Sequence, residues 1–210
     1  MHGRRWFRHS AITLVACFVL PAAGAAQRRL ELTPFLAGHV PTSPLGSIRL
    51  QLIGSQPTTV EAEMKTAGGF GGRVGFWPSD RWGIEGTYFY AASDLRVTAG
   101  PFTTTIDAEL QGGSVKAFLK ATRGQTGTDL LVSAGVSGIQ HGGDAFRLAS
   151  EQFDIGGVIG SSLQVVMSPQ VTFRIDGELY LYRWAAGPQF SATTQSDLMM
   201  TVGLGLRLAR

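Results

Sequence analysis

Two histidines are the residues of this chain best suited to acid–base chemistry. His39 has Ser43 and Ser93-Asp94 as candidate partners, and His141 has Ser150-Glu151. A histidine beside a hydroxyl and a carboxylate supplies the residue types of nucleophilic or general-base catalysis. These residue types are common in any polar loop, and we expect both histidines to be exposed loop residues without a catalytic role.

Known motifs for binding a metal or a phosphate, or for activating a serine, are missing from the sequence. Beyond the first 26 residues, which contain His2, His9 and the only cysteine, two histidines remain. They cannot make a typical structural zinc site, and there is no H-E-x-x-H, P-loop or G-x-S-x-G pattern. The glycine runs lack the helix that a phosphate cradle requires. The sequence therefore predicts no cofactor, no metal and no enzymatic activity.

A second set of reactive side chains occupies alternate positions. In the segment 172–184, Arg174, Asp176 and Glu178 are separated by Ile175 and Gly177. A period of two indicates a strand with two unlike faces. In a soluble protein such charges would face water, whereas in a membrane barrel they would face the interior.

The first 26 residues have the organisation of a secretory signal. Three arginines precede the apolar run from Ala11 to Leu20, and the small residues Ala22 to Ala26 follow it. We predict a signal peptide over 1–26 and a single domain over 27–210. The alternative is lipidation at Cys17, because Leu14 to Cys17 resembles a lipobox.

The charge balance of the chain changes when this leader is removed. Three of the 18 Lys and Arg residues lie within 1–26 and none of the 15 Asp and Glu residues does, which leaves 15 of each sign. A chain without net charge offers no basic patch for nucleic acid. The only cysteine is Cys17, so no disulfide holds the mature fold.

Alternating hydrophobicity recurs along the mature chain and predicts eight strands. No window is long and apolar enough for a transmembrane helix. The connections alternate between tight turns at 77–81, 123–128 and 168–169 and longer links at 41–66, 141–153 and 187–194. The link at 98–102 is short unless its two strands continue beyond the membrane. The predicted strands are 29–40, 67–77, 82–97, 103–122, 129–140, 154–167, 170–186 and 195–209.

The length of the apolar faces distinguishes a membrane barrel from a soluble one. The apolar residues of 171–181 and of 198–208 each span eleven residues, and a tilted strand needs roughly 9 to 11 residues to cross a bilayer. We predict an all-β fold, an eight-stranded antiparallel up-and-down transmembrane β-barrel. A soluble lipocalin-like periplasmic carrier is the alternative.

In pattern, the mature chain resembles small eight-stranded outer-membrane β-barrel proteins such as the OmpA transmembrane domain and OmpX. Such proteins carry a C-terminal assembly signal, and Thr201, Gly203, Leu206 and Leu208 fit it. The family usually ends on an aromatic residue, whereas this chain ends Leu208-Ala209-Arg210. The resemblance implies a location in the cell outer membrane, contact with its lipid and recognition by its assembly machinery.

The barrel interpretation assigns a set of charged residues to the lumen. An eight-stranded barrel is just wide enough for side chains to fill it, so these charges must pair with one another. We predict that Arg73 lies opposite Glu85, and that Glu31 lies close to Arg207 where the barrel closes. The predicted interior charges are Glu31, Arg73, Glu85, Lys116, Lys120, Arg174, Asp176, Glu178 and Arg207.

Two further expectations concern glycine and the aromatic residues. The apolar phase changes from even to odd numbers across Gly112-Gly113, which predicts a β-bulge there. Most strand glycines are expected to make room for large inward neighbours. Tyr180, Tyr182 and Trp184 share the charged phase and should cap the lumen or rise above the bilayer.

The functional prediction is a closed, monomeric barrel that has a structural role or presents loops to an extracellular ligand. The loop 41–66 contains two alternating runs, at 48–52 and 60–64, that would extend a hairpin above the membrane. The alternative is an enzyme that modifies the acyl chains of lipid A, since some outer-membrane barrels do so. A porin is excluded by the packed lumen.

Overall fold

The computed structural model describes residues 29–43, 45–50, 58–122, 127–147, 153–184 and 193–208. The predicted signal peptide and Cys17 lie outside these residues. Within them the chain forms ten strands and one short 3₁₀ helix, and no helix there is long and apolar enough to span a membrane. The elements are β1 (Arg29–Pro41), β2 (Gly46–Leu50), β3 (Thr58–Met64), β4 (Ala67–Trp77), β5 (Trp82–Ala99), β6 (Phe102–Lys120), β7 (Thr128–Gly142), η1 (Asp144–Phe146), β8 (Phe153–Val166), β9 (Val171–Trp184) and β10 (Thr193–Leu208).

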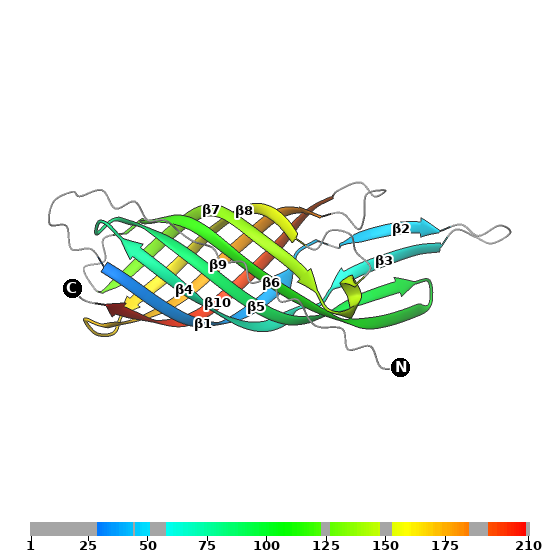
Figure 1. The fold of residues 1–210 in the computed structure, drawn as a ribbon, viewed down its shortest axis with the longest axis horizontal. Coiled ribbons are helices and arrows are strands. Elements are labelled where there is room, and N and C mark those ends of the chain that lie inside the picture. The colour runs from blue at the N-terminus through cyan, green and yellow to red at the C-terminus, as the bar shows by residue number, and fades with distance from the viewer. Residues whose placement is uncertain are drawn as a thin grey trace, which may run out of the picture.

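Eight of the strands close into a ring (Figure 1). The antiparallel order is β5-β4-β1-β10-β9-β8-β7-β6, and the pairing of β5 with β6 completes the circle. The first and last strands meet with Glu31 directly opposite Arg207. The eight-stranded antiparallel barrel predicted from the sequence is confirmed, with strand ends within a few residues of those expected.

Short turns join the strands at one end of the barrel, called the turn end below. At the β4–β5 turn, Ser79 Oγ accepts hydrogen bonds from the N–H groups of Arg81 and Trp82, at 3.3 and 3.2 Å. Ser168 Oγ accepts from the N–H of Val171 in the same way at the β8–β9 turn, at 3.0 Å. A serine hydroxyl that satisfies backbone donors stabilises a tight reversal of the chain.

At the opposite end, the loop end, the sheet continues beyond the ring (Figure 1). The hairpin of β2 and β3 joins the outer half of β5, with pairs from Met64↔Leu95 to Val60↔Ala99. Strand β6 runs alongside β5 up to the Ala99↔Phe102 pair that closes their hairpin. The strands β2 and β3 together with the outer parts of β5 and β6 form what we call the extension. It confirms that the loop 41–66 contains a β-hairpin.

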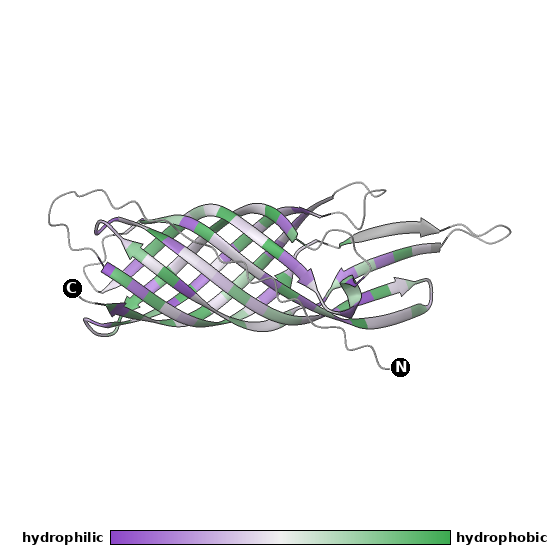
Figure 2. Ribbon diagram, in the orientation of Figure 1, coloured by the Kyte–Doolittle hydropathy of each residue, from purple (hydrophilic) through white to green (hydrophobic). Residues whose placement is uncertain are grey.

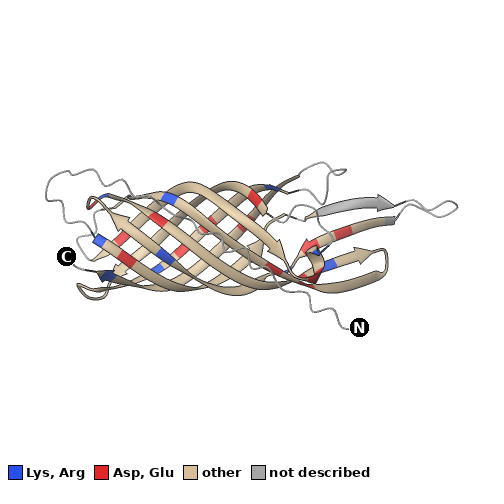
Figure 3. Ribbon diagram, in the orientation of Figure 1, with Lys and Arg blue, Asp and Glu red and all other residues tan. Residues whose placement is uncertain are grey.

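Hydrophobic and hydrophilic positions alternate along the barrel strands (Figure 2). Charged residues are distributed over several barrel strands (Figure 3). The exposed side chains of the ring are mainly apolar, and most of its charged side chains are buried on the inner face. In β9 the side chains of Arg174, Asp176 and Glu178 are buried, whereas Ile175 and Leu181 are exposed. Exposed apolar residues on the outside include Leu36, Phe70, Val136, Ile159, Met200 and Leu204.

The predicted β-bulge at Gly112-Gly113 is wrong. The register of β6 against β5 and against β7 is continuous through both glycines. Even-numbered residues face inward along β6 at both Leu110 and Lys116. The apolar phase changes because the lumen itself changes from polar to apolar along the barrel axis, so that Leu110 is apolar and inward.

Inward glycines provide space for inward aromatic rings. A Cβ atom on Gly112 would lie 2.3 Å from the ring of Phe89, and one on Gly71 would lie 2.4 Å from the ring of Phe35. Real Cβ contacts are never so short. These glycines therefore accommodate large neighbours, as the sequence predicts.

Candidate functional site: the lumen and the extension

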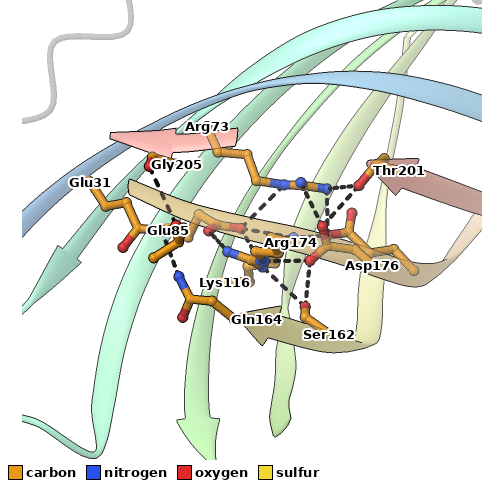
Figure 4. Close-up of polar contacts among 12 residues, drawn as sticks. Glu31, Arg73, Glu85, Lys116, Ser162, Gln164, Arg174, Asp176, Thr201 and Gly205 are labelled. Atoms are coloured by element: carbon orange, nitrogen blue, oxygen red, sulfur yellow. Dashed lines mark hydrogen bonds and ion pairs between the residues drawn. The ribbon is translucent and has the colours of Figure 1, made fainter. Parts of the chain in front are cut away.

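The middle of the lumen holds a compact group of six charged side chains, which we call the charge network: Arg73, Glu85, Lys116, Arg174, Asp176 and Glu178 (Figure 4). They come from β4, β5, β6 and β9, and each is at most 2 % exposed. The network contains three cations and three carboxylates, so it carries no net charge. Burying charges is tolerated only when they are paired and hydrogen-bonded.

Every carboxylate of the network contacts at least two cations. Glu85 lies 3.4 Å from Arg73 and 3.2 Å from Lys116, and it also pairs with Arg174. Asp176 pairs with Arg73 at 2.8 Å and with Arg174 at 2.6 Å. Glu178 pairs with Arg73 at 3.2 Å and with Lys116. The six side chains therefore form one connected unit.

Neutral hydroxyl groups add hydrogen bonds to the network. Thr201 Oγ1 lies 2.9 Å from both Arg73 and Asp176, accepting from the first and donating to the second. Ser162 donates to Asp176 and accepts from Arg174, and Tyr180 donates to Glu178 at 2.8 Å. Arg73 Nε lies 3.4 Å from Glu85 but makes no hydrogen bond within the described residues. The many connections among the other groups make a buried polar network rigid.

The register of β4 and β5 differs from the sequence prediction. Thr87 lies directly opposite Arg73, and Glu85 lies opposite Gly75. Arg73 nevertheless reaches Glu85 diagonally, two positions along the neighbouring strand. The long arginine side chain makes this contact possible, because diagonal neighbours on one face of a sheet are about 7–8 Å apart at their Cα atoms.

A separate polar group lies at the turn end. Glu31 accepts hydrogen bonds from Gln164 at 2.7 Å and from Thr172 at 3.0 Å, and Arg207 lies 3.6 Å away. Lys120 pairs with Asp129 at 2.7 Å. The nine charged residues expected in the lumen thus lie on the inner face in two groups, six in the charge network and three at the turn end.

Apolar side chains fill the lumen on the loop side of the charge network. Phe35, Phe89, Leu110, Ile139 and Met199 are at most 4 % exposed and pack against Tyr180 and Tyr182. The rings of Phe89 and Tyr180 meet edge to face, with centroids 5.5 Å apart. We call this cluster the apolar plug. Tyr180 and Tyr182 share the inward phase that the sequence predicts, but they are buried within the lumen rather than capping it.

On the loop side of the plug, five polar side chains form a third polar group, which we call the histidine chain: His39, Asp197, Tyr182, His141 and Asp154. Asp197 lies 3.2 Å from His39 Nε2 and accepts a hydrogen bond of 2.8 Å from Tyr182. Tyr182 Oη lies 3.4 Å from His141 Nε2, and His141 Nδ1 lies 3.4 Å from Asp154. The two histidines belong to β1 and β7, on different sides of the ring.

The expectation that both histidines are exposed loop residues is wrong. Each is 1 % exposed, and each lies on a strand with its ring in the lumen. His39 does not meet its expected partners, because Ser43 donates to Gln195, Ser93 donates to the Lys65 carbonyl and Asp94 pairs with Lys65. Ser150-Glu151 lies outside the described residues. Within those residues, no cluster of three or more His, Cys, Asp and Glu could hold a metal ion.

Sequence reasoning missed the carboxylates of the histidine chain. Asp197 lies inside the predicted strand 195–209 and continues the inward phase of Gln195, Met199 and Thr201, so the alternation could have found it. Asp154 lies at the first inward position of β8 and at the first residue of the predicted strand 154–167. Both lie near a strand end beside a loop, where the alternating pattern is short.

The fold has close counterparts among solved structures. OprG of Pseudomonas aeruginosa, an outer membrane protein, matches with a TM-score of 0.65 at 11% identity, over 88% of this chain and 97% of OprG. The outer membrane protein AlkL, solved in DMPC lipid bilayers, matches with a TM-score of 0.58 at 9% identity, over 92% of this chain and 96% of AlkL. The fold is that of small outer-membrane β-barrels. The location expected from the sequence, the cell outer membrane, agrees with this fold.

Comparison at the level of sequence finds no match. No protein-family model matches the chain, and no curated protein matches it. At such low identity the structural likeness establishes the fold alone, so function has to be argued from the lumen and the extension.

Proposed function

We propose that this chain is a closed, non-conducting barrel of the outer membrane that presents its extension at the cell surface for interaction with other molecules. The observation that carries the proposal is the division of the molecule into a filled lumen and an open sheet. The lumen is occupied along its axis by the turn-end group, the charge network, the apolar plug and the histidine chain. The extension continues beyond them without being part of the ring.

The apolar exterior supports residence in a membrane over the soluble alternative. A lipocalin-like carrier would bury its apolar residues and expose its charges, and this barrel does the reverse. In barrels of this kind the short turns face the periplasm and the longer loops face outward. The extension therefore belongs on the extracellular side.

An enzyme acting on lipid A receives no support from the histidines. A general base must come within hydrogen-bond reach of the proton that it removes. His39 and His141 are each 1 % exposed, and the rings of Phe146 and Trp184 lie 5.1 and 6.4 Å from that of His141. We propose that the histidine chain is structural.

The assembly machinery and the monomeric state are part of the same proposal. Thr201 and Gly203 face inward on β10, whereas Leu206 and Leu208 are exposed on its outer side. Replacing both leucines with serine should slow membrane insertion while purified protein still refolds in detergent. If the wild type and this variant insert at equal rates into vesicles that contain the assembly machinery, the two leucines are not part of the assembly signal.

The decisive experiment is conductance in planar bilayers combined with labelling on intact cells. The purified barrel, verified by its heat-dependent gel shift, should leave the conductance at baseline. A protease site inserted between β2 and β3 should be cleaved from outside, whereas one added after Arg210 should be protected. Stepwise channel openings, or the opposite cleavage pattern, would refute the proposed function.

A further inference from the structure

Strand β6 is the outermost strand on one side of the extension. It pairs with β5 along its whole length, but its pairing with β7 begins only at Glu109↔Gly142. Residues 102–108 therefore have one edge that no strand of the described residues covers. An unpaired edge presents a row of backbone donors and acceptors.

The inner end of this edge is covered by the start of the η1 segment. A Cβ atom on Gly143 would lie 2.8 Å from the carbonyl oxygen of Asp107 and 2.9 Å from the Cα atom of Ala108. Gly143 has a φ of 84°, which a residue with a side chain rarely adopts. The chain thus passes directly against Asp107 and leaves residues 102–106 open.

This close approach also shows which backbone groups point to the open side. The Asp107 carbonyl points toward Gly143, away from β5. In an antiparallel pair, alternate residues direct their N–H and C=O groups toward the same neighbour. Thr103 and Thr105 share the phase of Asp107, so their backbone groups point to the open edge. Those of Thr104 and Ile106 point to β5.

The open edge lacks the features with which proteins usually block strand addition. Its sequence, Phe102-Thr-Thr-Thr-Ile106, contains no charge and no proline, and it is rich in β-branched residues. Residues 102 to 105 are exposed, and Phe102 is 77 % exposed. The sequence of β2, at the other edge of the sheet, contains Arg49.

We infer that the edge formed by residues 102–106 of β6 binds an extended polypeptide segment, which adds a strand to the extension through the backbone groups of Thr103 and Thr105. The inference rests on the proposed function and names its partner class. A neutral row of alternating N–H and C=O groups is matched by another strand, whereas an anion or a sugar offers no such repeat. An apolar side chain of the partner would pack on Phe102.

The first test uses synthetic peptides and the full barrel in nanodiscs. The probe is a biotinylated eight-residue peptide of alternating Thr and Val, with one version N-methylated at the odd residues alone and another N-methylated at every residue. The unmodified peptide should bind, and the half-methylated version should bind comparably, because the N–H groups of its even residues still form one complete edge. The fully methylated version should bind at least ten-fold more weakly, because it has no N–H to donate. Equal binding of the unmodified and the fully methylated peptides, or no binding of the unmodified peptide, would overturn the inference.

The second test changes the edge of the barrel. Thr105→Pro removes the N–H that faces the partner without removing a bond to β5, and proline is tolerated on edge strands. Thr105→Val is the matched control, because it keeps the N–H and loses only the hydroxyl. Peptide binding should fall at least ten-fold in the proline variant and stay unchanged in the valine variant. Wild-type binding by the proline variant would contradict the inference.

A second copy of this chain is the competing occupant. Cys17 is the only cysteine of the sequence and belongs to the predicted signal peptide, so Thr103→Cys gives the mature barrel a single thiol. We expect the cysteine variant to stay monomeric with a free thiol. We also expect the peptide to protect the backbone amides at Thr103 and Thr105 from hydrogen exchange. If the variant instead forms disulfide-linked dimers rapidly and these dimers do not bind the peptide, the occupant of the edge is a second copy of this chain and not a foreign polypeptide. None of these outcomes bears on conductance or cleavage, which test the proposed function separately.

Discussion

The charge network and the histidine chain both contain buried carboxylates, but the two groups differ in the partners that neutralise them. In the network, three carboxylates are shared among two arginines and a lysine that remain charged across the physiological range. In the histidine chain, Asp197 and Asp154 have histidines as their ion-pair partners, and a histidine is charged only when protonated. Each carboxylate of the network pairs with at least two permanent cations, whereas each aspartate of the histidine chain has one ion-pair partner among the described residues, a histidine. We therefore expect the network to contribute more to stability.

The largest expected effect comes from removing one cation of the network. Arg73→Met leaves Glu85, Asp176 and Glu178 each without one partner in a buried site. Breaking a buried pair by removing one member typically costs about 3–5 kcal/mol. We expect a loss of this order in the free energy of unfolding, measured by urea titration in lipid vesicles.

A paired deletion checks whether the loss reflects uncompensated charge. Arg73→Met combined with Asp176→Leu should be less destabilising than the sum of the two single changes, because it restores neutrality. A strictly additive result would show that the two side chains do not act as one unit.

A smaller effect is expected from the histidine chain. Asp197→Asn removes the carboxylate that lies between His39 and Tyr182, but the amide oxygen still accepts from Tyr182. The cost should be about 1–3 kcal/mol, the range for a disturbed buried hydrogen bond. A loss as large as that of Arg73→Met would end the distinction between the two regions.

The apolar plug that separates the two regions can be tested by overpacking. Gly112→Val places atoms against Phe89 and should destabilise the barrel by about 1–3 kcal/mol. The matched control is Gly86→Ala, since a Cβ atom on Gly86 meets nothing within 4 Å. Equal losses of stability in the two variants, by the same urea titration, would contradict the packing described for the plug.

The smallest coupling is expected at the turn end. Glu31 keeps its hydrogen bonds from Gln164 and Thr172 when Arg207 is replaced. A double-mutant cycle of Glu31→Ala and Arg207→Ala should give a coupling of about 1 kcal/mol or less, near the value for exposed pairs. If the cycle shows no coupling, Glu31 and Arg207 do not interact although they lie directly opposite each other on neighbouring strands.

The sequence predicts the strands and their faces well, because both follow from a period of two. The apolar and charged faces of β9 and the hairpin within 41–66 emerge from alternation alone. Contacts along the barrel axis are harder to predict from the sequence, because they depend on strand register and side-chain length. Arg73 reaches Glu85 diagonally, from two positions along the neighbouring strand, and this contact cannot be predicted from the alternation within either strand.

The histidines and the supposed bulge show a second limit of sequence reasoning. The polarity of His39 and His141 predicts exposure, but both side chains are buried in a lumen that accommodates polar groups. The apolar character of Leu110 predicts contact with lipid, whereas this residue belongs to the plug. Both errors come from treating the lumen as uniform, when its chemistry changes from layer to layer.

The charge network also constrains the order in which the barrel can enter a membrane. Its members are separated by up to 105 residues in the chain, as in the contact between Arg73 and Glu178. A β4–β6 sheet inserted without β9 would bring two cations and one carboxylate into lipid without Arg174, Asp176 and Glu178. The energy of unpaired charge in hydrocarbon opposes that intermediate. The strands must therefore gather at the water interface and cross the bilayer nearly together, so that closure of the ring and insertion become one event.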